Sequence, residues 1–295
     1  MPSLKDLRNR ISSVKSTKKI TSAMKMVAAA KLRKAQDNAL EARPYSSNMN
    51  KIVRNLTENP NIVFEKPSLI SGKQENNTVL LIICSADRGL CGGFNGSIIR
   101  HTKKEINKKK AEGKKVRLLF IGKKAHQALK RVYGDITLRV FTDFANPNVD
   151  FNQVCEIRNY LIKGFFNDTF DSCELVFTRF KSAISQDVTQ KVVLPLVTAE
   201  NNNDKDIKPS SVSYEFEPNE EQILDDIVPK NIAIQIFTAL LESAASEQGA
   251  RMTAMDNATR NANDMIDNLT LFYNRSRQAV ITKELIEIIS GAEAI

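Results

Sequence analysis

The loop SADRGLCGGFNG, residues 85–96, has residue types that could bind a phosphate group. It follows an apolar run rich in β-branched residues, Thr78–Cys84, and precedes a helical pattern, which is where a phosphate-binding turn would lie. It contains neither the GxGxxG fingerprint nor a GxxxxGK[ST] motif. We therefore favour a structural explanation, in which Gly89, Gly92 and Gly93 allow positive φ and tight backbone packing. We expect no cofactor and no small-molecule substrate.

The cysteines and histidines do not follow a metal-ligand pattern. There is no CxxC spacing, and the two histidines are far apart in the sequence. We expect no metal site, and we interpret the thiols as reduced, mostly buried side chains in a reducing compartment. These residues are Cys84, Cys91, Cys155, Cys173, His101 and His126.

Catalysis by side chains alone is not indicated either. No nucleophile has a recognisable base beside it, and no carboxylate pair has an interpretable spacing. We therefore expect that the chain is not an enzyme on its own. No apolar run approaches the roughly 20 residues that span a bilayer, and the start MPSLKDLRNR lacks the apolar core of a signal peptide. We expect neither a membrane span nor secretion by that route.

The remaining chemical feature of the sequence is its excess of basic residues. The formal net charge is +9, and ten basic residues in the first part of the chain face a lone Asp6. Such a helix repels itself unless something acidic surrounds it, so an anionic partner is expected. Charge alone does not choose between a nucleic acid, a lipid and an acidic protein surface. The ten are Lys5, Arg8, Arg10, Lys15, Lys18, Lys19, Lys25, Lys31, Arg33 and Lys34.

These charges must be positioned by a long helix over residues 1–57. Ser3 and Asp6 form a capping box ahead of it, and Pro44 should kink or interrupt it. Apolar residues follow 3-4-3 spacing, which then slips and resumes at Ile20. This narrow seam is suited to one partner helix. The predicted seam is Leu4, Leu7, Ile11 and Val14, then Ile20, Met24, Val27 and Lys31, with Leu32 and Ala35 beside them.

Residues 76–215 change to alternating strands and helices, which predicts a Rossmann-like α/β domain with a parallel sheet. Two further strands, for which antiparallel pairing at an edge is an open alternative, should end the domain before a polar loop, Asn201–Ser211. The predicted strands are 78–84, 116–122, 136–141, 173–180 and 191–197. The predicted helices follow the loop at 85–96, follow the strand 116–122, and cover 155–166.

Residues 219–295 should form a second long helix, with Pro229 in its first turn. Sixty-odd helical residues make a rod of roughly 90 Å. Its centre is rich in alanine and methionine, as is the first helix, and the two should pack as a long antiparallel coiled coil. Two helices lying on the sheet would need wider apolar faces. The predicted seam is Ile234, Phe237, Leu241, Ala244, Ala245, Gln248, Met252, Met255, Ala258, Ala262, Met265, Leu269 and Phe272.

The chain ends in AVITKELIEIISGAEAI, residues 279–295. A terminus is normally polar and frays, so this apolar end calls for an apolar socket in a partner.

Three segments resemble the gamma subunit of F-type ATP synthase. They are ITSAMKMVAAAKLRKAQ (20–36), the loop at 85–96, and above all SEQGARMTAMDNATRNANDMIDNLTLFYNRSRQAVITKELIEIISGAEAI (246–295). The resemblance implies a non-catalytic central-stalk rotor. Its terminal helices turn inside a hexamer of alpha and beta subunits, and its α/β domain sits on the epsilon subunit and the c-ring. Proton flow through the membrane then drives ATP synthesis in the beta subunits.

The resemblance also assigns contact residues. Met24 and nearby bases correspond to positions facing acidic loops of beta. Arg251 falls in the ARM motif, and the RQAxxT segment meets beta loops that catch the shaft. The expected beta contacts are Met24, Lys18, Lys19, Lys31, Arg33, Arg251, Arg277, Gln278 and Thr282, and the expected bearing tip is Leu285, Ile286, Ile288 and Ile289.

Two expectations about location and class complete this interpretation. We expect a peripheral subunit on the cytoplasmic side of a bacterial plasma (inner) membrane, because no Arg- and Ser-rich transit sequence precedes MPSL. A mature organellar chain remains open, and the coupling ion and c-ring size belong to the partners. The alternative from a different class is a basic coiled-coil nucleic-acid-binding protein. The absence of interleaved aromatic residues speaks against it.

Overall fold

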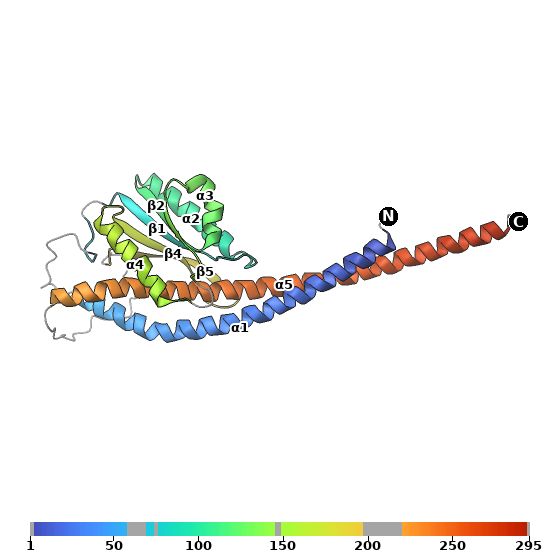
Figure 1. The fold of residues 1–295 in the computed structure, drawn as a ribbon, viewed down its shortest axis with the longest axis horizontal. Coiled ribbons are helices and arrows are strands. Elements are labelled where there is room, and N and C mark those ends of the chain that lie inside the picture. Colours follow the sequence, from blue (N-terminus) through green and yellow to red (C-terminus); the bar gives the residue numbers. More distant parts are fainter. Residues whose placement is uncertain (1–2, 58–68, 74–75, 145–148, 197–219, 294–295) are drawn as a thin grey trace. The chain divides into compact units, whose positions relative to one another are not determined.

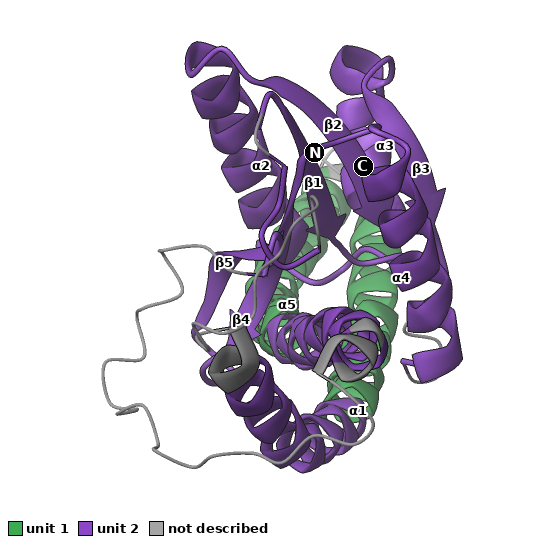
Figure 2. Ribbon diagram, turned by 90° about the vertical axis from the view of Figure 1, so that its left-hand side faces the viewer, with its two compact units in different colours: residues 1–29, 251–295 green, residues 30–250 purple. Residues whose placement is uncertain are grey.

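The structure is a computed structural model of the 295-residue chain (Figure 1). It describes residues 3–57, 69–73, 76–144, 149–196 and 220–293. These fall into two units, which Figure 2 colours separately. One unit consists of residues 1–29 with 251–295, and the other of residues 30–250. We describe each unit by itself and call them the helical unit and the sheet unit.

The sheet unit is built on five strands in the order β3-β2-β1-β4-β5. The pairs β1–β2, β1–β4 and β2–β3 are parallel, and β5 pairs antiparallel with β4 at one edge. The order 3-2-1-4 is that of a doubly wound sheet. The predicted Rossmann-like α/β class and its antiparallel edge strand are therefore confirmed. The strands are β1 Thr78–Cys84, β2 Lys115–Ile121, β3 Thr137–Phe141, β4 Ser172–Phe180 and β5 Gln186–Leu194.

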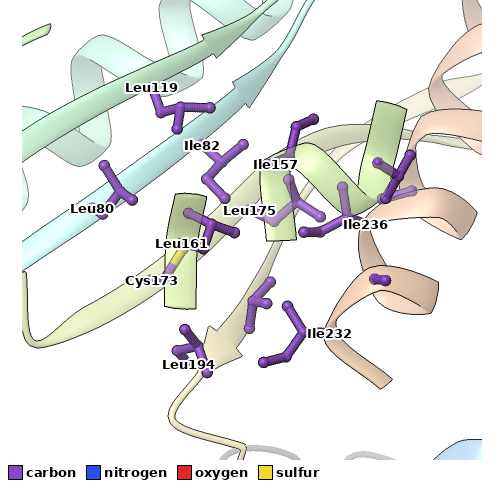
Figure 3. Close-up of a cluster of buried hydrophobic side chains, with 14 of the residues drawn as sticks. Leu80, Ile82, Leu119, Ile157, Leu161, Cys173, Leu175, Leu194, Ile232 and Ile236 are labelled. Atoms are coloured by element: carbon purple, nitrogen blue, oxygen red, sulfur yellow. The ribbon is translucent and has the colours of Figure 1, made fainter. Parts of the chain in front are cut away.

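Helices cover both faces of this sheet (Figure 1). Because side chains alternate along a strand, β1 contributes Leu80 and Ile82 to one core and Leu81 and Ile83 to the other. The first core contains α4 Phe151–Phe166 and part of α5, as Figure 3 shows for Ile157, Leu161, Ile232 and Ile236. The second contains α2 Phe94–Ala111 and α3 Lys123–Tyr133.

Two predicted element boundaries are wrong. The last strand starts at Gln186 and ends at Leu194, instead of covering 191–197. The first half of this strand is polar, so the sequence pattern did not predict it as a strand. It joins the sheet because it pairs with β4, where Phe180 lies opposite Gln186. Helix α4 begins at Phe151, four residues early, because the Asp150 carboxylate accepts a hydrogen bond from the Asn152 N–H at 3.0 Å. The predicted loop 201–211 lies outside the described residues.

The two long helices are α1, Leu4–Thr57, and α5, Glu220–Glu293. The predicted capping box is present: the Asp6 N–H donates to Ser3 Oγ at 3.1 Å, and the Ser3 N–H donates to Asp6 Oδ2 at 3.3 Å. Helix α1 continues through Pro44 without interruption. Helix α5 begins nine residues before Pro229, so the prediction that this proline lies in the first turn is wrong.

Helix α5 packs on the sheet within the sheet unit, which the sequence analysis excluded. Ile232 and Ile236 are fully buried in the same core as the strand residues Leu175 and Leu194 (Figure 3). Ala233 is fully buried in this core as well. Every residue from Asn231 to Ile236 is buried, so this stretch of the helix is covered on all sides. The narrow-seam description holds only for the later residues of α5, in the helical unit.

Candidate functional site

The seam of α1 in the helical unit runs without a slip. Buried and half-buried positions follow one another at alternating steps of three and four residues from Leu4 onward. Ile20 and Val27, which we predicted in the seam, are 60% and 57% exposed. Polar and small residues occupy the seam positions that the apolar pattern did not predict. The observed seam is Leu4, Leu7, Ile11, Val14, Lys18, Thr21, Lys25 and Ala28.

The facing residues of α5 keep the same alternating steps. Met265 and Phe272, also predicted in the seam, are 52% and 44% exposed, whereas Met255 and Ala262 are buried as predicted. Small side chains such as Ala28 and Ala262 let two helices approach closely, which favours them in a seam over bulkier neighbours. The observed seam is Met252, Met255, Thr259, Ala262, Ile266, Leu269, Tyr273 and Ser276.

Polar contacts cross from α1 to α5 within the helical unit, and we call three of them the polar ladder. Arg8 Nη2 donates to Tyr273 Oη at 3.3 Å, the hydroxyl oxygens of Thr21 and Thr259 lie 2.8 Å apart, and Lys25 Nζ donates to Asp256 Oδ1 at 2.6 Å. Residue numbers rise along α1 as they fall along α5. The predicted antiparallel arrangement is therefore confirmed.

Asp256 is the electrostatic centre of this ladder. Its other carboxylate oxygen accepts a hydrogen bond from Arg260 Nη2 at 2.6 Å, one turn along the same helix. The hydrogen bond from Lys25 is the main cause that holds the pKa of the Asp256 carboxyl below its usual range, and the positive charge of Arg260 adds to it. The carboxylate is therefore ionised throughout the physiological pH range.

The expected beta-contact residues of α1 fall in both units. Lys18 and Met24 are half-buried and Lys19 is exposed in the helical unit, while Lys31 and Arg33 are exposed in the sheet unit. The structure therefore brings the first three together on one helix segment.

The expected contact residues of α5 lie in the helical unit. Arg251 is half-buried, and Arg277, Gln278 and Thr282 are exposed. The Thr282 hydroxyl donates to the backbone oxygen of Gln278 at 2.9 Å, within the helix. Thr259, beside Thr21, is 18 residues before Arg277, or roughly 27 Å along the helix. The structure thus separates an early group around Lys18 from a late group around Arg277.

The late group and the apolar tail have no partner helix in the described part of the chain. Arg8, only four residues after α1 begins, already reaches Tyr273, so α5 extends past the start of α1. Every residue from Arg277 to Ser290 is exposed. The expected tip residues Leu285, Ile286, Ile288 and Ile289 are 53%, 58%, 68% and 58% exposed, as are Val280 and Ile281 at 40% and 47%.

A set of apolar side chains on α1 is exposed, which the apolar pattern did not predict. Ile20, Met26 and Val27 are 60%, 65% and 57% exposed and lie among the lysines. An unbroken 3-4 repeat from Leu4 would have placed them outside the seam. They add apolar surface to the predicted basic contact face.

The loop at 85–96 is anchored by hydrogen bonds to neighbouring segments. Only Gly92 of its three predicted glycines has positive φ, at 55°, and Leu90 also adopts it, at 64°. Asn95 Oδ1 accepts a hydrogen bond from the Ala86 N–H at 3.1 Å, and Asp87 accepts from the Lys123 and Asp143 N–H groups at 3.1 and 2.9 Å. These contacts tie the loop to its neighbours. A cavity of about 30 Å³ beside Ser85 and Asp87 has room for about one water molecule.

None of the helices in the described residues is long and apolar enough to cross a membrane.

Comparisons with known proteins agree along the whole chain. A family model described as ATP synthase matches residues 3–295. The chain is 52% identical over 300 residues to the ATP synthase gamma chain of Rhodospirillum rubrum, and 49% identical over 295 residues to that of Paracoccus denitrificans. Each of these alignments covers 100% of both chains.

Solved structures show the same similarity. A chain in the central stalk/c-ring structure of the Tetrahymena thermophila mitochondrial ATP synthase is 29% identical, with a TM-score of 0.61, and the match covers 81% of this chain and 99% of that one. A chain of the Euglena gracilis mitochondrial ATP synthase has a TM-score of 0.67, with 99% and 94% covered, and at 21% identity it supports the fold alone.

Proposed function

This chain belongs to the ATP synthase gamma-chain family, and we propose that its helical unit is the part that contacts the catalytic beta subunits. The chain is a rotor subunit of ATP synthase and is not catalytic by itself. Its partners are other subunits of that complex. Family membership favours this function over the nucleic-acid-binding alternative.

One observation carries the assignment of contacts: α5 extends beyond the start of α1 as a single helix whose apolar residues from Val280 to Ile289 are exposed. A side chain such as Ile288, 68% exposed, is destabilising in water and is covered in the working complex. Leu285, Ile286, Ile288 and Ile289 then form the tip held in an apolar bearing of the alpha–beta hexamer.

The basic and polar residues supply the sliding contacts. Exposed Lys or Arg contacts with carboxylates contribute about 0–1 kcal/mol each, so they attract acidic loops of beta without locking the shaft. On α1 these residues are Lys18, Lys19, Lys31 and Arg33, with the apolar Met24 among them, and on α5 they are Arg251, Arg277, Gln278 and Thr282.

The remaining partners are assigned by position in the family. The sheet unit contacts the epsilon subunit and the c-ring, and rotation of the c-ring, driven by proton flow, turns the chain. The chain is then a peripheral protein on the cytoplasmic side of a bacterial plasma (inner) membrane. The bacterial origin of its relatives supports this location.

Reconstitution tests the proposal. Alpha and beta subunits are combined with the full chain, with a chain that ends at Asn274, and with no chain, and steady-state ATP hydrolysis is measured. We expect the full chain to support multi-site turnover and the shortened chain to assemble or couple less well. An equal rate of ATP hydrolysis with and without this chain would overturn the proposal.

A further inference from the structure

The seam of the helical unit has a polar middle. Three successive seam positions of α1 are Lys18, Thr21 and Lys25, and the next is Ala28. An apolar seam of small residues attracts without direction, because dispersion and burial depend little on how far one helix is displaced along the other. Polar residues at seam positions instead find polar partners across the seam in only one alignment, and a single such residue can specify the register of a coiled coil.

Two of these three positions have specific partners on α5. The Lys25–Asp256 ion pair has side chains that are 44% and 23% exposed, and the Thr21–Thr259 contact lies one turn away. Arg8–Tyr273 adds a third contact further along the same helices. All three agree on one antiparallel alignment.

A displacement by one heptad would break these contacts. The residues seven before and seven after Asp256 are Gly249 and Asn263, and neither carries a carboxylate. The corresponding residues around Thr259 are Met252 and Ile266, so the displacement would remove the cross-helix contact of the Thr21 hydroxyl and leave only its bond to the Lys18 backbone oxygen at 3.1 Å. The small apolar residues would tolerate the same displacement much better.

We propose that the Lys25–Asp256 ion pair, supported by Thr21–Thr259, fixes the register between α1 and α5 and so couples the two helices mechanically during rotation. This inference rests on the proposed rotor function and assigns Lys25 and Asp256 as positioning residues. A two-helix shaft transmits torque only if its helices do not slide past each other. The cross-helix contacts prevent that sliding because they join α1 to α5 directly.

The chain offers a matched control on the same carboxylate. Lys25→Gln removes the bond that crosses between helices, whereas Arg260→Gln removes a bond of the same length, 2.6 Å, within α5. Lys25→Arg keeps the cross-helix charge. The three variants therefore separate register control from a general loss of charge around Asp256.

Register is measured directly on the purified full-length chain with Thr21→Cys and Thr259→Cys, by the rate of disulfide formation under mild oxidation and by peptide mapping. A slipped register is reported by Thr21→Cys with Ile266→Cys. We expect Lys25→Gln to slow the native cross-link by about two- to fivefold and to speed the slipped one, since half-exposed ion pairs are of this strength. Arg260→Gln should change neither rate, and Lys25→Arg should restore both.

Coupling is measured in the reconstituted complex as protons pumped per ATP hydrolysed. Lys25→Gln should lower this ratio by about twofold or more while ATP hydrolysis is retained, and Lys25→Arg should restore it. Equal effects of Lys25→Gln and Arg260→Gln on both readouts, or an unchanged cross-link in Lys25→Gln, would overturn the inference. Equal steady-state ATP hydrolysis by alpha and beta subunits with and without this chain would instead overturn the proposed function. The cross-link rates measured on the purified chain would still decide whether the ion pair fixes the register.

Discussion

The hydroxyl of Ser246 donates a hydrogen bond to the backbone carbonyl oxygen of Thr178 at 3.0 Å, which ties α5 directly to strand β4. Ser246 is fully buried. One turn later, a Cβ added to Gly249 would lie 3.4 Å from Ala183 Cα, so small residues allow the helix to lie against the β4–β5 hairpin. The sheet unit therefore holds this part of α5 by close packing.

Replacing Ser246 should weaken this attachment. Ser246→Ala removes one buried hydrogen bond and should lower the free energy of unfolding by about 1 kcal/mol. Ser246→Leu also overpacks the contact and should cost about 1–3 kcal/mol more. Urea unfolding followed by circular dichroism measures both. Ser47→Ala, at an exposed position of α1, is the control and should not lower stability; equal stability of all three variants would contradict this account of the packing.

Gly122 should be much harder to replace than Gly113. Its φ is 99°, and an added Cβ would lie 2.0 Å from the Ser85 carbonyl oxygen. Gly122→Ala should therefore lower stability by about 3 kcal/mol or more, through both strain and displacement of the loop. Gly113 also has positive φ, at 78°, but an added Cβ meets nothing within 4 Å. Gly113→Ala should cost only about 1 kcal/mol, and thermal unfolding of the two variants compares them.

The four thiols should differ strongly in reactivity. Burial raises the pKa of the Cys84 thiol to about 12 and raises that of Cys173 as well, with the charge of Glu174 as a further cause for Cys173. Cys155 is half-buried. Because the thiolate is the nucleophile, iodoacetamide at pH 8 should label Cys155 first and leave Cys84 and Cys173 unmodified until the protein unfolds. Mass spectrometry of labelled peptides measures this order, and early labelling of Cys84 would be inconsistent with its burial.

The helical unit should lose one source of stability only in acid. The pKa of Asp256 is lowered in the folded state, chiefly by the hydrogen bond from Lys25. Its contribution is therefore fully present above the unfolded-state pKa of about 3.9 and is lost as the pH falls through the lower folded-state value. The stability difference between wild type and Asp256→Asn should be constant from about pH 5 to 8 and should shrink below about pH 4. Asp264→Asn, at an exposed position, is the control variant; a difference that grows in acid would contradict the sign.

Amide exchange should vary along α5 in the isolated chain. Residues 231–236 are buried in the sheet unit and should exchange slowly, whereas residues 277–290 are exposed and should exchange fast. Binding to the alpha–beta hexamer should slow exchange in residues 277–290 if they form the bearing tip. Strong protection throughout residues 250–289 in the isolated chain would contradict this expectation.

Strand and helix types were predictable from local patterns because these patterns are strong in the sheet unit. Thr78–Cys84 forms a strand with the predicted bounds, and Lys123–Tyr133 a helix. The start of β5 was not predictable, since Gln186 and Asp187 join the sheet only because β4 lies beside them. The burial of Asn231 also depends on neighbours: its amide donates to Asn50 Oδ1 at 3.1 Å, across 181 positions of the chain.

The sequence by itself determined the elements, the α/β class and the presence of two long helices with an apolar end, because periodicity and composition act locally. The tertiary structure alone decided which residue of α1 pairs with which residue of α5. Hydrophobicity selected Ile20 and Val27 for the seam, but the structure places Thr21 and Ala28 there, because close approach of two helices favours small side chains and pairs Lys25 with Asp256. Such pairing depends on the partner helix, more than 200 residues away in the chain, and no local pattern contains it.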